Sequence, residues 1–399
     1  MASICSMLLF ILTSLTSVHV HAALSKVIFN SSFTELTNAR CLDGTSAGYF
    51  FEAGDSSRFV IFLQGGGACY TVSGAGDTNC AVRAKTALGS SSYWPSTYSD
   101  ENNVLSDNTD INPFANFSRV FVPYCTGDVH LGTRTTVVSP DFPFYFSGHH
   151  IIGGVIAHLL ETTSLGTATQ VLLSGASAGG IGSTVNSDFV AAALPQARVR
   201  AAPQAGWFFP SVVNYTAFQR GNNGPPYAGQ DGRVSALWES YLPPACVAAK
   251  GRDYCSYVSF SFPYLTTEFH ISEDLEDSNQ LFAQLGVPSR NITDPEVVKY
   301  ILNFQGIMRK GLVERVSAAS QNSLFAPACL LHTENLNLAS QTKLGAGGYT
   351  LRDSLGAWFF GVPQGVPRVL VDSCTGVSCN PTCAPAAAAS DGAFLLPQE

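Results

Sequence analysis

The sequence predicts an α/β fold in which helices cover both faces of a mostly parallel central sheet. Apolar runs rich in β-branched and aromatic residues predict strands at 48–52, 58–63, 119–122, 170–173, 199–202 and 264–271. Patterns with a helical period lie between several of these runs, at 151–160 and 181–194. Strands that alternate with helices are typical of a parallel sheet, because each crossover returns the chain to the same end of the sheet. Long stretches rich in Gly, Ser and Asn, at 71–110 and 203–235, predict loops over the carboxyl edge of the strands, where ligands bind in such folds.

The first 22 residues are expected to be a secretory signal peptide. They contain the apolar run Leu8–Leu12 and end in the small-residue pattern Val20-His21-Ala22. The remainder, 23–399, has no internal repeat and no clear composition break, so we expect a single domain. It also contains no second long apolar run, so we expect no integral membrane segment. The sequence therefore predicts a secreted protein, located outside the cell or in a cell wall.

The cysteine content agrees with an oxidising compartment. Of eleven cysteines, Cys5 lies in the signal peptide, which leaves an even number. An even number in a secreted chain predicts disulfides. The alternative is a zinc site at Cys374, Cys379 and Cys383, but their spacing is loose and no paired histidines lie nearby. The cysteines expected in disulfides are Cys41, Cys69, Cys80, Cys125, Cys246, Cys255, Cys329, Cys374, Cys379 and Cys383.

Charge and composition narrow the possible partners. The net charge is −8 and no run of Lys or Arg occurs, which argues against nucleic acid as a partner. Hydrophobic residues make up 46% of the chain and charged residues 13%, so a large core is available and we expect a monomer. Four sequons mark candidate glycosylation sites on surface loops, at Asn30, Asn116, Asn214 and Asn291.

A Gly-x-Ser-x-Gly motif stands where the predicted strand 170–173 gives way to a helical pattern. The motif spans Gly175 to Gly179, with Ser177 at its centre. This arrangement is typical of the nucleophile elbow of serine hydrolases, a turn so tight that a Cβ at either glycine would strike backbone. The elbow exposes the serine Oγ and points the N–H of Ala178, at the helix N-terminus, toward the same spot. The alternative is an ordinary strand–turn–helix connection with an idle serine.

The order of the remaining catalytic groups selects a histidine. In α/β hydrolases the nucleophile is followed by the acid and then by the histidine. His158 falls on the apolar face of a predicted helix and is expected to be a core or surface histidine, and His270 lies within a predicted strand. His332 is the only histidine after the strand 264–271 and is the candidate base by elimination.

The acid is less well defined by the residues alone. The segment 272–278 follows the same strand and contains four carboxylates, at Glu273, Asp274, Glu276 and Asp277. Most of them are expected to be solvated loop charges. The residue types and their order do not choose among the four.

A second group of glycines provides a candidate oxyanion loop. Gly65, Gly66 and Gly67 follow the predicted strand 58–63 directly. Glycines after an early strand allow backbone N–H groups to approach a substrate carbonyl. A phosphate-binding loop is the alternative, but no Gly-Lys-Ser/Thr follows.

Several blocks together resemble the pectin acetylesterase family, which includes the secreted carboxylesterase Notum. The resemblance extends from about residue 40 to 385 and is specific as a set, although each block alone is weak. The blocks are Cys41–Thr45, Leu63–Cys69, Pro123–Asp128, Ser174–Ser183, Ala205–Phe208, Phe325–Cys329 ahead of His332, and Val371–Cys374 with Cys379–Cys383.

The resemblance implies an α/β-hydrolase fold and a set of site residues. It assigns Ser177 as nucleophile, His332 as base and Asp277 as acid, because 276–281 matches the family's Tyr-Asp-Ser-Trp-Gln-Ile element without a gap. The N–H groups of Gly66 and Ala178 would form the oxyanion hole. No metal or organic cofactor is needed for this chemistry.

The family pattern also implies disulfide pairs. It pairs Cys41 with Cys125, Cys69 with Cys80 and Cys246 with Cys255. The four C-terminal cysteines would pair among themselves, with one bridge tying the segment of Cys329 to the tail.

Three departures from the family pattern bear on substrate choice. Gln64 replaces an acidic residue, Ala68 a tryptophan beside the site, and Gln204 an aspartate. None removes a member of the triad, but Ala68 changes the wall of the acyl pocket, so acyl specificity cannot be inherited.

The resemblance and the polar loops together lead to three hypotheses. The first is a secreted carboxylesterase that removes O-acetyl groups from a polysaccharide such as pectin. The second is a Notum-like deacylase that removes a fatty acyl group from a protein, and the third is an inactive binding module. Five aromatic residues in the loops favour a sugar, since such rings can stack on sugar faces. They are Tyr93, Trp94, Trp207, Phe208 and Phe209.

Overall fold

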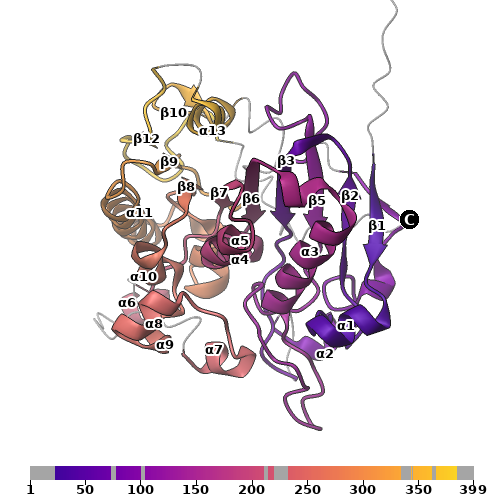
Figure 1. Ribbon diagram of the computed structural model, residues 1–399. Coiled ribbons are helices and arrows are strands. Elements are labelled where there is room, and N and C mark those ends of the chain that lie inside the picture. Colours follow the sequence, from indigo (N-terminus) through magenta and orange to yellow (C-terminus); the bar gives the residue numbers. More distant parts are fainter. Residues whose placement is uncertain are drawn as a thin grey trace, which may run out of the picture.

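A ten-stranded sheet runs through the molecule (Figure 1). The computed structural model describes residues 23–72, 78–99, 104–210, 214–219, 232–333, 343, 345–361 and 365–383. The predicted signal peptide 1–22 and the alanine-rich tail 384–389 lie outside the described residues. The strand order is β12-β9-β8-β7-β6-β3-β5-β2-β1-β4. In chain order the strands are β1 (Leu24–Ile28), β2 (Gly48–Glu52), β3 (Asp55–Leu63), β4 (Thr97–Tyr98), β5 (Phe117–Val122), β6 (Gln170–Ala176), β7 (Arg198–Gln204), β8 (Glu268–Ser272), β9 (Ser323–Ala326) and β12 (Val369–Val371). A separate hairpin pairs β10 (Gly345–Ala346) with β11 (Tyr349–Thr350).

The sheet is mostly parallel, as predicted. All strands from β5 to β12 in the spatial order pair in parallel, whereas β2, β1 and β4 form an antiparallel edge. One predicted strand, 264–271, is shorter than expected, because β8 begins only at Glu268. Its predicted start falls on a 3₁₀ turn, Phe262–Tyr264. Pro263 favours that turn because it lacks an N–H for a strand ladder and its ring sets a helical φ.

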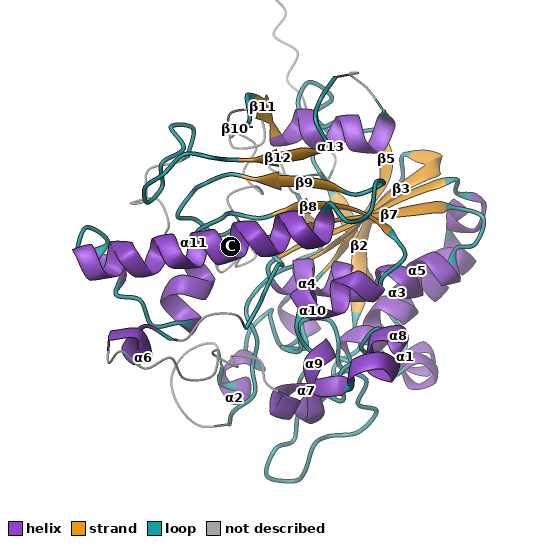
Figure 2. Ribbon diagram, turned by 90° about the vertical axis from the view of Figure 1, so that its left-hand side faces the viewer, coloured by secondary structure: helices purple, strands orange, loops and turns teal. Residues whose placement is uncertain are grey.

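Helices cover both faces of the sheet, also as predicted. The longest, α11 (Pro295–Val316), and α13 (Leu351–Phe360) lie on opposite sides of β8 and β9 (Figure 2). Alternate residues of β8 show why. Phe269 and Ile271 share a buried cluster with α11, whereas His270 between them bonds to Ser354 of α13.

The predicted helix 181–194 is two helices instead of one. They are α4 (Ala178–Val185) and α5 (Ser187–Ala193), with α3 (Gly148–Thr162) preceding β6. The break falls at Asn186, whose buried side-chain amide donates to the carbonyls of Gly182 and His130. A side chain that bonds to backbone in this way competes with continuation of the helix.

The remaining helices are short and lie around the sheet and its loops. They are α1 (Ser31–Thr37), α2 (Cys80–Arg83), α6 (Tyr215–Gln219), α7 (Gly232–Trp238), α8 (Pro244–Lys250), α9 (Arg252–Cys255) and α10 (Val258–Ser261).

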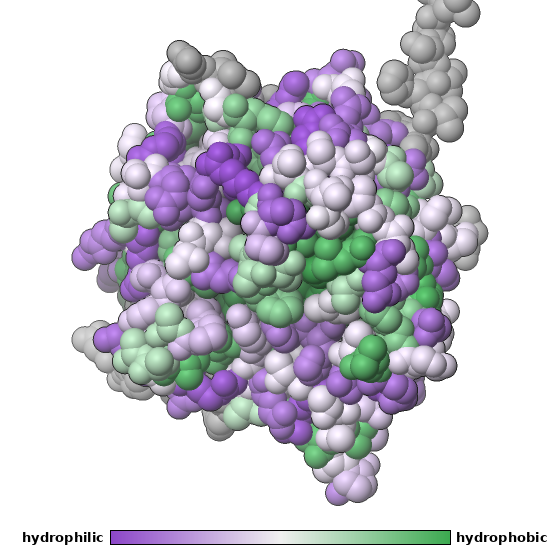
Figure 3. Space-filling model, viewed as in Figure 1, coloured by the Kyte–Doolittle hydropathy of each residue, from purple (hydrophilic) through white to green (hydrophobic). Residues whose placement is uncertain are grey.

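The surface is mixed in character. Figure 3 shows hydrophilic and weakly hydrophobic residues interspersed over the face seen in Figure 1, with small apolar areas beside α3 and α1. In the part of the chain that the structure describes, no helix is both long and apolar enough to cross a bilayer. The single-domain organisation of 23–399 stays a prediction.

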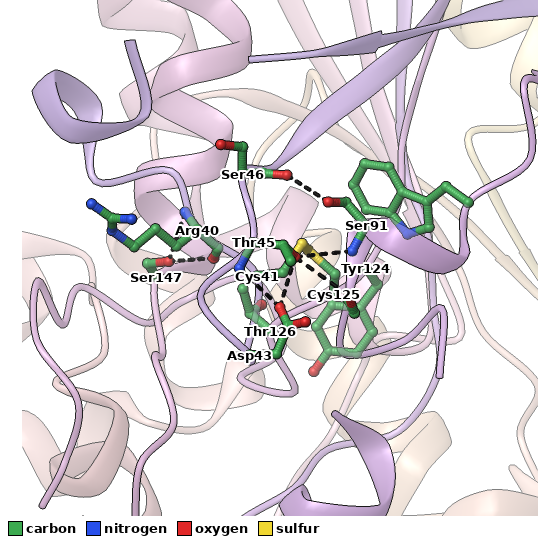
Figure 4. Close-up of a disulfide and its surroundings, with 12 residues drawn as sticks. Arg40, Cys41, Asp43, Thr45, Ser46, Ser91, Tyr124, Cys125, Thr126 and Ser147 are labelled. Atoms are coloured by element: carbon green, nitrogen blue, oxygen red, sulfur yellow. Dashed lines mark hydrogen bonds between the residues drawn. A yellow bond between two sulfur atoms is a disulfide. The ribbon is translucent and has the colours of Figure 1, made fainter. Parts of the chain in front are cut away.

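Five disulfides connect the loops. They are Cys41–Cys125, Cys69–Cys80, Cys246–Cys255, Cys329–Cys383 and Cys374–Cys379. The first three are the pairs that the resemblance implied, and the fourth ties the segment of Cys329 to the tail. The Cys41–Cys125 bridge lies among hydrogen bonds in which Thr45 donates to Asp43 and accepts from the N–H of Ser91 (Figure 4). The three cysteines considered for zinc are all in disulfides.

Candidate active site

Ser177 lies in a sharp turn between the end of β6 and the start of α4. Its backbone has φ 54° and ψ −119°, a region that residues other than glycine rarely adopt. The turn is held by the Ser177 N–H, which donates to the carbonyl of Gln204 at 3.0 Å. A Cβ on Gly179 would lie 2.0 Å from the carbonyl oxygen of Leu63, and one on Gly175 would lie 2.3 Å from that of Gly179. The collisions expected at both glycines are therefore present.

Three residues far apart in the chain form one hydrogen-bonded row. The Nε2 atom of His332 is 2.9 Å from the Oγ atom of Ser177. Its Nδ1 atom is 2.6 Å from the Oδ2 atom of Asp277. The three follow β6, β8 and β9 at their carboxyl ends, so the parallel sheet brings them to one edge. The geometry brings together the three residues that the sequence analysis singled out.

The acidic loop after β8 is buried, and here the sequence analysis was wrong. Glu273, Asp274, Glu276 and Asp277 all have 0% exposed surface, although most of them were expected to be solvated. The loop 273–278 packs against the segment 325–331, which leads to His332. Backbone bonds join Glu273 to Phe325, Leu275 to Pro327 and Ser278 to Leu331.

Burial changes the ionisation of two of these carboxyls. It raises the pKa of Glu273 well above its ordinary value, and the negative charge of Asp277 raises it further. Burial also raises the pKa of Glu276 to about 7, against hydrogen bonds from the N–H of Ser378 and the amide of Gln305. Asp277 accepts a bond from the N–H of Gln280 at its second oxygen, 2.8 Å away.

The glycine loop after β3 runs beside the nucleophile. A Cβ on Gly65 would lie 3.2 Å from the Cβ of Ser177, and Gly66 has a φ of 137° that favours glycine. The buried Arg83 donates from Nη2 to the carbonyl of Gly66 at 2.6 Å and from Nε to the carbonyl of Leu88. This contact fixes the peptide next to the candidate oxyanion donor.

Further side chains support this loop, and the sequence analysis gave them no role. The side-chain oxygen of Gln64 accepts from the N–H of Tyr124 at 2.9 Å. The Nε2 atom of His130 lies 2.9 Å from the carbonyl oxygen of Gln64. Burial lowers the pKa of His130 to about 4, so its ring is neutral at pH 7 and donates this bond. The departure of Gln64 from the family pattern was the one sequence signal at this place.

Two other histidines pack against other side chains. The Nδ1 atom of His158 is 2.9 Å from the hydroxyl of Tyr49, and its ring contacts Phe29. His270 is buried, and its Nε2 atom is 3.0 Å from the Oγ atom of Ser354.

The loop aromatics mostly do not face solvent, which corrects their proposed role as sugar platforms. Trp94, Trp207 and Phe208 are buried, and Phe209 packs against Phe304. Tyr93 is 55% exposed. Phe208 instead faces the candidate base, with its ring centroid 6.5 Å from that of His332.

Neither a metal cluster nor a buried sequon occurs in the described residues. No group of three or more His, Cys, Asp or Glu there could hold a metal ion. Among the sequons, Asn30, Asn116 and Asn291 are exposed and Asn214 is partly exposed, so glycosylation remains a prediction.

The fold and the hydrogen-bonded row are those of an α/β-hydrolase-like carboxylic ester hydrolase. The chain belongs to the pectinacetylesterase family, whose profile matches residues 23–384. It is 31% identical to palmitoleoyl-protein carboxylesterase notum2 of Xenopus laevis, over 88% of this chain and 73% of that protein. It is 28% identical to pectin acetylesterase 5 of Arabidopsis thaliana, over 88% of this chain and 83% of the relative. The solved structure of the Wnt deacylase Notum from Drosophila superposes with a TM-score of 0.75 at 26% identity, covering 91% of this chain and 100% of that one.

Proposed function

We propose that this protein is a secreted serine carboxylesterase that works through a Ser177–His332–Asp277 triad. The observation that supports this most is the hydrogen-bonded row, with 2.9 Å between Ser177 Oγ and His332 Nε2 and 2.6 Å between His332 Nδ1 and Asp277 Oδ2. Such a row activates a serine that is otherwise a weak nucleophile.

The reaction proceeds in two steps. His332 accepts the Ser177 proton at Nε2 while Oγ attacks the ester carbonyl carbon. The tetrahedral intermediate collapses, the ester C–O bond breaks, and His332 returns the proton to the leaving alcohol. Water then attacks the acyl-enzyme by the same proton route and releases the acid. Asp277 accepts the Nδ1–H, which fixes the tautomer and stabilises the imidazolium. No cofactor enters the scheme.

The N–H groups of Gly66 and Ala178 stabilise the oxyanion in this proposal. Ala178 is the first residue of α4, where backbone N–H groups have no helical partner. Gly66 is held through its carbonyl by Arg83. Loss of one oxyanion donor typically lowers kcat by about 10²–10³.

The substrate we favour is an O-acetyl group on a polysaccharide such as pectin. The relative named pectin acetylesterase supports it, whereas the burial of Trp94, Trp207 and Phe208 removes part of the earlier argument for a sugar. The second candidate is a fatty acyl group on a protein, because relatives at 31% identity are palmitoleoyl-protein carboxylesterases. Ala68, where the family pattern has a tryptophan, leaves more room beside the site for such a chain. In either case we propose that the protein is a single-domain monomer and acts outside the cell. Size-exclusion chromatography of the secreted product checks that it is a monomer.

Acyl-chain length separates the two substrates. We expect p-nitrophenyl acetate to be hydrolysed faster than p-nitrophenyl octanoate, with Ser177→Ala as the control that removes about 10⁴-fold or more of the rate. An octanoate rate at least tenfold above the acetate rate would favour the protein deacylase. A fluorophosphonate probe tests for an inactive binding module, since only an activated serine is labelled.

A further inference from the structure

A second carboxyl lies against the acid of the triad. Glu273 directly follows β8 and has 0% exposed surface. Its Oε2 atom accepts a hydrogen bond from the N–H of Trp207, 2.8 Å away in the loop after β7. One oxygen of the carboxyl is thus satisfied by a neighbouring loop.

The other carboxyl oxygen of Glu273, Oε1, can form a hydrogen bond to a neighbouring carboxylate only if a proton is shared between them. No N–H or O–H of the described residues donates to Oε1 of Glu273. The side chain lies against that of Asp277, within reach of a hydrogen bond once one of the two carboxyls carries a proton. Two ionised carboxylates can only accept, so the pair can bond only in that protonated form. Asp277 already accepts from Gln280 and His332, whereas Oε1 of Glu273 has no donor, so we place the proton on Glu273.

The surrounding charges agree with this assignment. The charged groups that act on Glu273 are Asp277 and Asp274 on its own loop, and both disfavour a further negative charge. From the loop after β9, the titratable group is His332, which reaches Glu273 through Asp277. From the loop after β7, the contact is the backbone of Trp207. Burial and these charges together raise the pKa of Glu273 well above its ordinary value.

We propose that Glu273 is a positioning residue, whose neutral carboxyl donates a hydrogen bond to Asp277 and holds that carboxylate toward His332. The inference rests on the proposed function, since it extends the triad by one residue. Glu273 also helps to connect the loop after β8 with the loop after β7, since it accepts from the N–H of Trp207. Gln280 makes a second connection, because its side-chain amide donates to the carbonyl of Trp207. Phe208, the neighbour of Trp207, faces the ring of His332.

Ionisation of Glu273 would remove the hydrogen bond that holds the Asp277 carboxylate in place. A second negative charge beside Asp277 would break the shared hydrogen bond and repel the Asp277 carboxylate. The esterase rate should accordingly fall on the alkaline side as Glu273 loses its proton.

Isosteric replacement tests the proposal. In Glu273→Gln the amide carbonyl can accept from Trp207 while the NH₂ donates to Asp277, so both bonds of the neutral acid are kept. We expect kcat/KM for p-nitrophenyl acetate within about threefold of wild type at pH 7, and no alkaline decline from this group. Glu273→Leu loses both bonds and should lower kcat at least about tenfold, with KM little changed. Glu276→Gln is the matched control, because Glu276 lies on the same loop but accepts its hydrogen bonds from Gln305 and Ser378.

The outcomes decide between the alternatives. Glu273→Leu with wild-type kcat and pH profile overturns the proposal, as does a folded Glu273→Gln as impaired as Glu273→Leu. If Glu273→Leu does not fold, the pH profiles of wild type and Glu273→Gln decide alone, and an identical alkaline decline in both overturns it. A wild-type protein without Ser177-dependent hydrolysis would instead refute the proposed function itself.

Discussion

The bridge between Cys329 and Cys383 should stabilise both the fold and the position of the proposed base, His332. Cys329 lies three residues before His332, and the two cysteines are 54 residues apart in the chain. The chain-entropy relation for a closed loop of that length corresponds to about 4 kcal/mol at 25 °C. The bridge Cys374–Cys379 closes a separation of only 5 residues, for which the same relation gives about 2 kcal/mol. The second bridge is thus a matched control in the same part of the chain.

Paired Cys→Ser variants measure the difference. Removal of Cys329–Cys383 should lower the free energy of unfolding by about 2 kcal/mol more than removal of Cys374–Cys379, as measured by urea titration. It should also lower kcat by about tenfold, because small displacements of a catalytic group are costly. Two hydrogen bonds of the Ala328 backbone remain and limit the loss, because its N–H donates to the carboxylate of Asp372 and its carbonyl accepts from the N–H of Asn380. Equal destabilisation by both pairs, or unchanged kcat in the Cys329/Cys383 variant, would contradict this account.

Three further predictions concern the loop after β8 and the elbow. Asp277→Asn should lower kcat for p-nitrophenyl acetate by about 10²–10⁴, and far more than Asp274→Asn, because Asp277 is hydrogen-bonded to the proposed base His332. A larger loss in Asp274→Asn would show that the acid is misassigned. Glu276, with a pKa of about 7 against an ordinary 4.5, favours the folded state fully below about pH 4.5, and this stability is lost as the pH rises through 7. The full change is about 3 kcal/mol, and urea titrations at pH 5 and 8 should show about 2.5 kcal/mol of it as the difference in pH dependence between wild type and Glu276→Gln. Gly179→Ala should destabilise the fold by about 3 kcal/mol or more, since its Cβ would lie 2.0 Å from the backbone oxygen of Leu63, and an unchanged Tm would contradict the elbow geometry.

Features with a local cause could be predicted from the sequence. Five of the six predicted strands match observed strands to within a few residues, because a buried parallel strand needs a nearly continuous apolar run. The elbow at Ser177 was also predictable, since close backbone contacts on both sides of the turn require glycine at fixed spacing. His332 followed from chain order alone.

Features that depend on distant partners could not be predicted in this way. α11 was missed although it starts with an Asp294 cap and Pro295, signals that were present in the sequence. The carboxylates after β8 appeared to be surface charges, since burial of acidic residues depends on donors that the fold brings from elsewhere. Those donors are the backbone N–H groups of Trp207 and Ser378 and the side-chain amide of Gln305.

Local sequence patterns were enough to predict the fold class and to single out Ser177 and His332 as candidate nucleophile and base, and a resemblance to related chains added Asp277 as candidate acid. Only the tertiary structure decided that four carboxyls share one buried loop, that Glu273 lies against Asp277, and that Cys329 pairs with Cys383. The physical reason is the range of the interactions. Backbone sterics and apolar periodicity act within a few residues, whereas desolvation and hydrogen bonding of a buried charge depend on groups that only the folded chain brings together.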